Sequence, residues 1–135
     1  MNFSVSAIVL YAVVGAVLLT YLPFLVVGFA RMQVGYDVSA PRAMFDKLPP
    51  YAQRATWAHQ NSFEALIIFS AAALMAYTTG VESNLAGGAA IAFLIARLLY
   101  SLFYILDIPL ARSLMFGIGS VSSATLFVLS LMSVD

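Results

Sequence analysis

The sequence of 135 residues contains no cysteine, a single histidine and few charged side chains. Without cysteine the chain can form no disulfide, no thiolate metal site and no cysteine nucleophile. A single histidine also argues against a metal centre, because such centres draw on several ligands of this kind. Six basic residues balance six acidic ones, so the net charge of zero gives no sign of nucleic-acid binding or of a polybasic lipid patch.

Apolar side chains dominate the remainder of the chain. Hydrophobic residues make up 63% and charged residues 9% of the sequence, and the mean hydropathy is +0.99. Soluble domains are instead about half apolar and about a quarter charged. We therefore expect a multi-pass integral membrane protein in contact with membrane lipid. The amino-terminal apolar run lacks the basic region of a signal peptide and continues to Ala30, so we expect a retained helix.

Polar segments divide the sequence into four apolar runs, each close to the length of about 20 residues that crosses a membrane. The pattern predicts an all-α fold, a membrane four-helix bundle in a single domain over residues 1–135. Pro23 should kink the first helix. Charges and prolines between residues 31 and 50 predict the one substantial loop. The expected spans are residues 3–31, 51–79, 85–106 and 110–134.

Small residues on the last span form a face that favours close helix packing. They are Gly117, Gly119, Ser120, Ser122 and Ser123.

The basic residues indicate an orientation in the membrane. They gather in the first loop, at the start of the second span and at the start of the fourth: Arg31, Arg42, Lys47, Arg54 and Arg112. Because cytoplasmic loops carry an excess of Lys and Arg, we expect loops one and three in the cytoplasm. Both chain termini would then lie on the opposite side.

Polar residues inside two of the expected spans are the first candidates for function, since ionisable groups are costly at that depth. Helical spacing places Asn61 and Glu64 one turn apart on the second span, and Arg97, Tyr100 and Tyr104 on one face of the third. A carboxylate beside a guanidinium is stabilised in its charged form. We therefore expect Glu64 and Arg97 to pair, with the two tyrosines adding hydroxyl groups along the same groove.

Each of these residues also fits a structural role. Glu64 and Arg97 fit an ion pair that fixes helix register without chemistry. Tyr100 and Tyr104 fit aromatic residues at the membrane–water interface. His59 fits an interfacial hydrogen-bonding residue as well as a ligand contact or an acid–base group.

The same residues lie in stretches that resemble a known family. Residues 57–64 read WAHQNSFE, residues 96–100 read ARLLY, and these are followed by Tyr104 and by ARS at residues 111–113. The pattern resembles the MAPEG family, the membrane-associated proteins in eicosanoid and glutathione metabolism, and covers essentially all four spans. It is similar to a bacterial-type member related to the microsomal glutathione transferases.

The resemblance implies a homotrimer of four-helix bundles with glutathione bound at each subunit interface. It identifies Arg112 as the catalytic residue, beside the glutathione thiol. That role agrees with its chemistry, because a guanidinium near a helix N-terminus stabilises a thiolate, although Arg112 also fits a topology anchor. The residues expected to bind glutathione are Arg31, His59, Asn61, Glu64, Arg97, Tyr100 and Tyr104.

Two functions from different classes remain open. The first is a glutathione-dependent membrane transferase or peroxidase that acts on lipophilic electrophiles or lipid hydroperoxides. The second is a non-catalytic trimeric scaffold, an accessory subunit or a lipid-binding membrane protein of the same fold. Trp57 favours the second, because the glutathione-using members carry an arginine there. The set formed by Asn61, Glu64, Arg97 and Arg112 favours the first.

Overall fold

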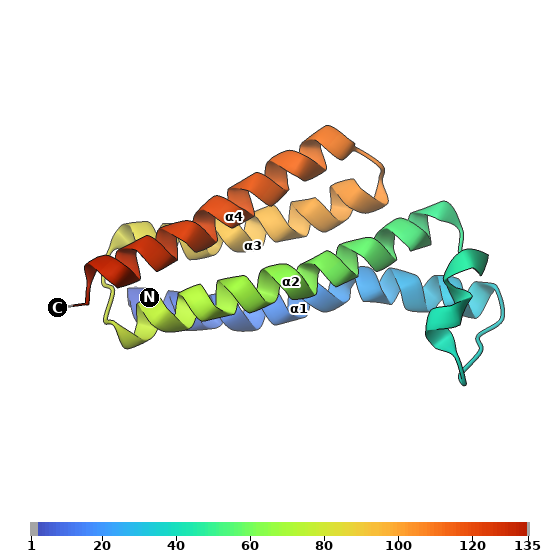
Figure 1. Ribbon diagram of the computed structural model, residues 1–135, viewed down its shortest axis with the longest axis horizontal. Coiled ribbons are helices and arrows are strands. Elements are labelled where there is room, and N and C mark those ends of the chain that lie inside the picture. Colours follow the sequence, from blue (N-terminus) through green and yellow to red (C-terminus); the bar gives the residue numbers. More distant parts are fainter. Residues whose placement is uncertain (1–2, 135) are drawn as a thin grey trace.

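The computed structural model describes residues 3–134. In this range the chain forms four long α-helices and one short 3-10 helix, and it contains no β-strand (Figure 1). Each long helix is long and apolar enough to cross a membrane, so the all-helical prediction is confirmed. The long helices begin and end within two residues of the expected spans. The elements are α1 (Val5–Gln33), η1 (Pro41–Lys47), α2 (Pro50–Thr78), α3 (Asn84–Ile105) and α4 (Pro109–Met132).

The residues at the helix starts explain where the helices begin. The hydroxyls of Ser4 and Ser83 cap α1 and α3, each accepting a hydrogen bond of 3.2 Å from a backbone N–H in the first turn. Helices α2 and α4 instead begin with Pro50 and Pro109. A proline costs no hydrogen bond there, because the first N–H groups of a helix have no partner within it.

Small side chains bring the helices together. Alanines such as Ala55, Ala72 and Ala90 are fully buried, which lets the helix backbones approach closely. Two aromatic rings fill the centre of the bundle, where Phe69 and Phe93 stack with their centroids 3.8 Å apart. Large apolar side chains are exposed on all four long helices. Such a surface suits a hydrocarbon environment.

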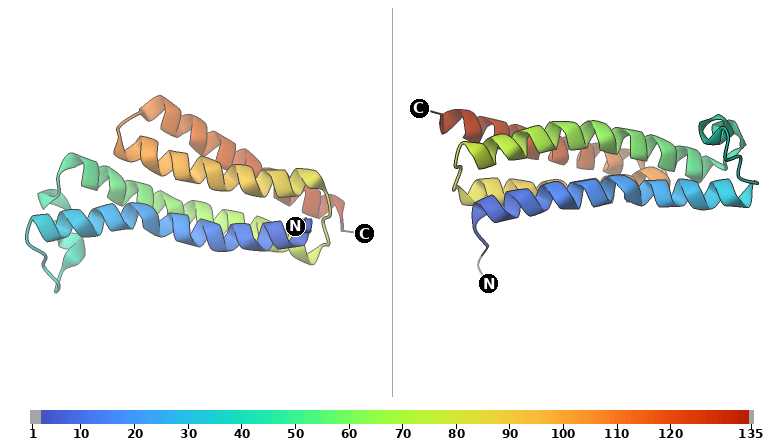
Figure 2. Two further views of the ribbon diagram at one scale, coloured as in Figure 1. Left: turned by 180° about the vertical axis from the view of Figure 1, so that it is seen from behind. Right: turned by 90° about the horizontal axis from the view of Figure 1, so that it is seen from below.

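The bundle consists of an α1–α2 pair and an α3–α4 hairpin. The hairpin diverges from the pair toward the end that carries η1 (Figures 1 and 2). The α3–α4 loop lies at this same end, and the described chain ends lie at the other (Figures 1 and 2). Loops one and three therefore share one end of the bundle, as their basic residues indicated. Which end faces the cytoplasm stays a prediction.

Helix η1 was not expected in the first loop. The amide of Gln53 on α2 fixes it by donating to the carbonyls of Phe45 and Leu48, each at 3.2 Å. Met44, at the middle of η1, is buried with 3% exposure. The second half of the loop is therefore packed against the start of α2.

The small residues of α4 divide between two surfaces. Gly119, Ser122 and Ser123 are buried inside the chain, whereas Gly117 and Ser120 are exposed. The close packing expected of this face is therefore used partly within the protomer, against α2 and α3.

Candidate functional site

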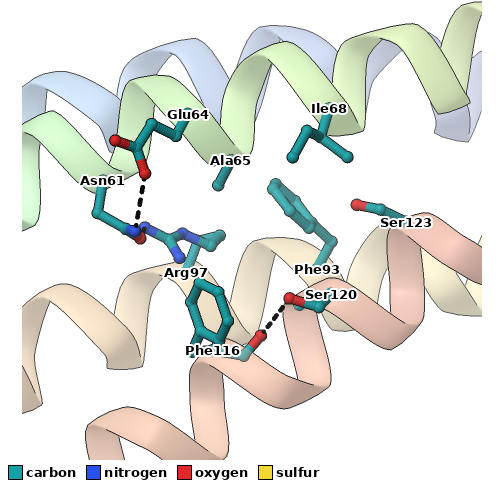
Figure 3. A pocket seen from close by; sticks show the side chains of 10 residues that line it. Asn61, Glu64, Ala65, Ile68, Phe93, Arg97, Phe116, Ser120 and Ser123 are labelled. Carbon is teal, nitrogen blue, oxygen red and sulfur yellow. Dashed lines mark hydrogen bonds between the residues drawn. The ribbon is translucent and has the colours of Figure 1, made fainter.

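A series of hydrogen bonds joins α2 to α3 in the membrane-spanning region. One nitrogen of the Arg97 guanidinium donates to Oδ1 of Asn61 at 3.0 Å and to Oγ of Ser62 at 3.2 Å. The amide nitrogen of Asn61 donates to Oε2 of Glu64 at 3.3 Å (Figure 3). Because a guanidinium only donates and a carboxylate only accepts, this orientation of the Asn61 amide satisfies both neighbours.

The prediction that Glu64 pairs directly with Arg97 is wrong. In the described part of the chain, no hydrogen bond or ion pair joins the two side chains, and Asn61 lies between them. The reason is that the two side chains are buried to different depths. Arg97 is 4% exposed and is satisfied by α2 side chains, whereas Glu64 lies on the exposed surface of α2.

A small cavity lies beside this series of hydrogen bonds, between α2, α3 and α4 (Figure 3). Its volume is about 130 Å³. Sites for drug-sized ligands hold about 300–1,000 Å³. One chain therefore does not enclose a tripeptide at this place. The lining includes Asn61, Glu64, Ile68, Phe93, Arg97, Phe116 and Ser120.

Arginine and tyrosine side chains continue the site toward the α3–α4 loop. The Arg97 guanidinium lies 4.0 Å from the centre of the Tyr100 ring, and the Arg112 guanidinium lies 4.6 Å from that of Tyr104. The two tyrosine rings meet edge to face at 5.6 Å. Cation–π contacts of this kind hold a guanidinium in place and leave its N–H groups for other partners. Contacts thus run without a break from Glu64 to Arg112.

Trp57 lies beside this series of contacts and belongs to an aromatic cluster. Its ring is 6.4 Å from the ring of Tyr104 and 5.6 Å from that of Phe45 on η1. The indole remains 43% exposed. Trp57 therefore presents an apolar wall at a position where a cation would present donors.

The structure does not bring Arg31 and His59 to the first cavity within one chain. They line a second cavity of about 510 Å³ between α1, η1 and α2, together with Arg42 and Gln60. Residues Asn61 and Glu64 face the α3–α4 hairpin, whereas His59 and Gln60 lie on the α1 side of α2. The sequence placed His59 beside Asn61 and Glu64 along α2 and did not indicate that two surfaces are involved.

His59 also has a structural partner on α1. Its Nδ1 lies 2.7 Å from the carbonyl oxygen of Thr20. Because a carbonyl only accepts, Nδ1 carries the proton and donates. Thr20 lies one turn before Pro23, where α1 lacks a backbone donor. His59 therefore ties α2 to the weakened turn of α1, in agreement with the hydrogen-bonding role weighed for it.

Ser62 was not among the expected site residues. Its hydroxyl donates to the carbonyl of Ala58 at 2.7 Å and accepts from Arg97. A serine beside Asn61 in the sequence gave no signal of this contact, since consecutive residues point about 100° apart around a helix.

Comparison with protein-family models matches residues 8–132 with the MAPEG family. The match covers nearly the whole chain and includes the residues that line both cavities. The comparison with curated proteins gave no match, and neither did the comparison with solved structures.

Proposed function

Since the chain belongs to the MAPEG family over residues 8–132, we propose that it is a glutathione-dependent membrane transferase or peroxidase. Its substrates would be lipophilic electrophiles or lipid hydroperoxides that enter from the bilayer. The unbroken series of contacts from Glu64 to Arg112 carries this proposal. This series places the Glu64 carboxylate, the buried Arg97 guanidinium and the Arg112 guanidinium in order along a mainly apolar region.

The residue types fit the chemistry of glutathione. The peptide carries an ammonium group, two carboxylates and a thiol, and the thiol attacks as a thiolate. Glu64 is an exposed carboxylate with a single hydrogen bond from Asn61, so it retains acceptor capacity for an ammonium group. Arg112 lies in the first turn of α4, where its charge adds to the positive end of the helix dipole at a thiolate.

The location of the cavities supports a shared site in a homotrimer. Arg31 and His59 lie on the α1 side of α2, and Asn61 and Glu64 on its other side. A site that uses both surfaces needs a second copy, whose α1–α2 side meets the α2–α4 side of the first. An interface between two different surfaces is heterologous, and it forms a ring when its rotation closes. The ring of three is what the family resemblance implies.

The proposed activity predicts a selective effect at Glu64. Glu64→Gln should raise the KM for glutathione about tenfold and leave kcat nearly unchanged, since loss of a binding contact affects binding more than chemistry. The measurement is turnover of glutathione with a lipophilic electrophile or a lipid hydroperoxide by protein in lipid vesicles. Glu82→Gln, in the loop after α2, is the matched control and should behave as wild type.

A second function has one observation in its favour. Trp57 lies between Phe45 and Tyr104 and supplies no charge for a peptide carboxylate. Wild type that binds no glutathione and turns over neither substrate class would contradict the enzyme. The non-catalytic scaffold, accessory subunit or lipid-binding protein would then be the better account.

A further inference from the structure

The second cavity contains two arginines and no carboxylate. It lies between the end of α1, η1 and the start of α2, and its volume is about 510 Å³. Arg31 and Arg42 line it beside Gln60, and none of its lining residues in the described part of the chain is acidic. Two guanidinium groups facing one cavity without a counter-charge favour an anionic ligand.

Arg31 shows the clearest need for a partner. Its Nε is buried and has no hydrogen-bond partner among residues 3–134. The guanidinium lies 6.0 Å from the Phe24 ring, which offers no acceptor lone pair. Buried donors are nearly always hydrogen-bonded, so an acceptor group in the cavity would explain this one.

Arg42 is held at the cavity by the fold of η1. Gln53 fixes this short helix through the carbonyls of Phe45 and Leu48. Met44 on η1 is buried, and its sulfur accepts a hydrogen bond of 3.3 Å from the backbone N–H of Asp37. The backbone at Arg42 is therefore fixed by packing, and its exposed side chain extends from there at the edge of the cavity.

The charges of glutathione indicate what this cavity receives. In the first half of the site, Glu64 suits the ammonium group and Arg112 suits the thiolate. Arg97 uses one nitrogen for Asn61 and Ser62. Because glutathione has two carboxylates, it needs cations besides Arg97, and Arg31 and Arg42 line the second cavity.

We propose that Arg42, together with Arg31, binds one carboxylate of glutathione in the second cavity. This inference rests on the proposed function and extends the site to η1. It assigns to Arg42 a binding role in place of the solvated loop charge that its sequence position suggests. Arg42 on the neighbouring helix η1 thereby supplies the positive charge that Trp57 lacks.

The test changes both the protein and the ligand and compares the resulting affinities. Calorimetry on the purified protein measures the affinity of each pair. Arg42→Gln should weaken glutathione binding about tenfold, as expected for a charge-assisted hydrogen bond. Lys47→Gln, which removes the same charge from η1 outside the cavity, should change affinity less than about twofold. Arg42→Lys should recover most of the affinity, which excludes misfolding as the cause.

The ligand side of the test uses two analogues, one amidated at the glycine carboxylate and one lacking the γ-glutamyl carboxylate. Arg42→Gln should have no further effect on one of them, because the contact is already absent. Equal weakening of glutathione and both analogues, or wild-type affinity in Arg42→Gln, would overturn the role of Arg42 alone. Wild type that binds no glutathione would overturn the proposed function and this inference together.

Discussion

At the scale of single residues, Asn61 holds the site together. Its amide connects the buried guanidinium of Arg97 to the exposed carboxylate of Glu64. We expect Asn61→Leu to lower the free energy of unfolding by about 1–3 kcal/mol, because it removes an acceptor from a buried charged donor. Glu64→Gln should cost less than about 1 kcal/mol, since Glu64 is exposed.

Thermal unfolding in detergent measures this difference. Gln60→Leu is the matched control, because it removes a neighbouring amide from an exposed position of α2. If Glu64→Gln lowered the free energy of unfolding as much as Asn61→Leu, the direct ion pair predicted from the sequence would be the better account.

Helical spacing was enough to predict that Asn61, Glu64, Arg97 and Tyr100 gather on facing surfaces. It was not enough to predict which of them touch. Spacing gives the direction of a side chain around its helix, whereas contact depends on how deep each residue lies and how closely the helices approach. Ser62 was missed for this reason, as its contact with Arg97 depends on the distance between α2 and α3.

At the scale of helices, one aromatic pair fills the centre of a core that is rich in alanine. Phe69 and Phe93 stack with an interplanar angle of 6° and are both almost fully buried. Phe93→Ala should lower the free energy of unfolding by about 3 kcal/mol, because it leaves a cavity that alanine-rich neighbours do not fill. The same change at Phe29, which is 58% exposed on α1, should cost less than about 1 kcal/mol.

Denaturation in mixed micelles gives both values. Similar costs at Phe93 and Phe29 would contradict the packing of α2 against α3.

The bounds of the long helices agree with the sequence to within two residues, since apolar runs and prolines mark the same ends. Helix η1 was not predicted, because its prolines and charges are typical of a loop. What fixes η1 is a tertiary contact, the hydrogen bonds from Gln53 to its backbone. The separation of Arg31 and His59 from Asn61 was likewise hidden, as it depends on which side of α2 each neighbouring helix covers.

At the scale of the whole molecule, the proposed glutathione site is shared between copies. The first cavity is too small for glutathione, at about 130 Å³. The second lies on another surface of the same chain. Each copy would offer one surface to each neighbour, so a closed ring has as many sites as subunits. The family resemblance and the exposed small residues Gly117 and Ser120 agree with such an assembly.

The most direct measurement of this claim is complementation between two inactive chains. Arg112→Ala removes the first half of the site and Arg31→Gln the second, so each variant alone should lose glutathione turnover. In randomly mixed rings of the two chains, an intact site forms wherever an unaltered first half meets an unaltered second half. That occurs at about a quarter of the interfaces. Co-expression of the two variants should therefore recover about a quarter of wild-type activity. No recovery, with both variants folded and assembled, would place the site within a single chain and contradict the account.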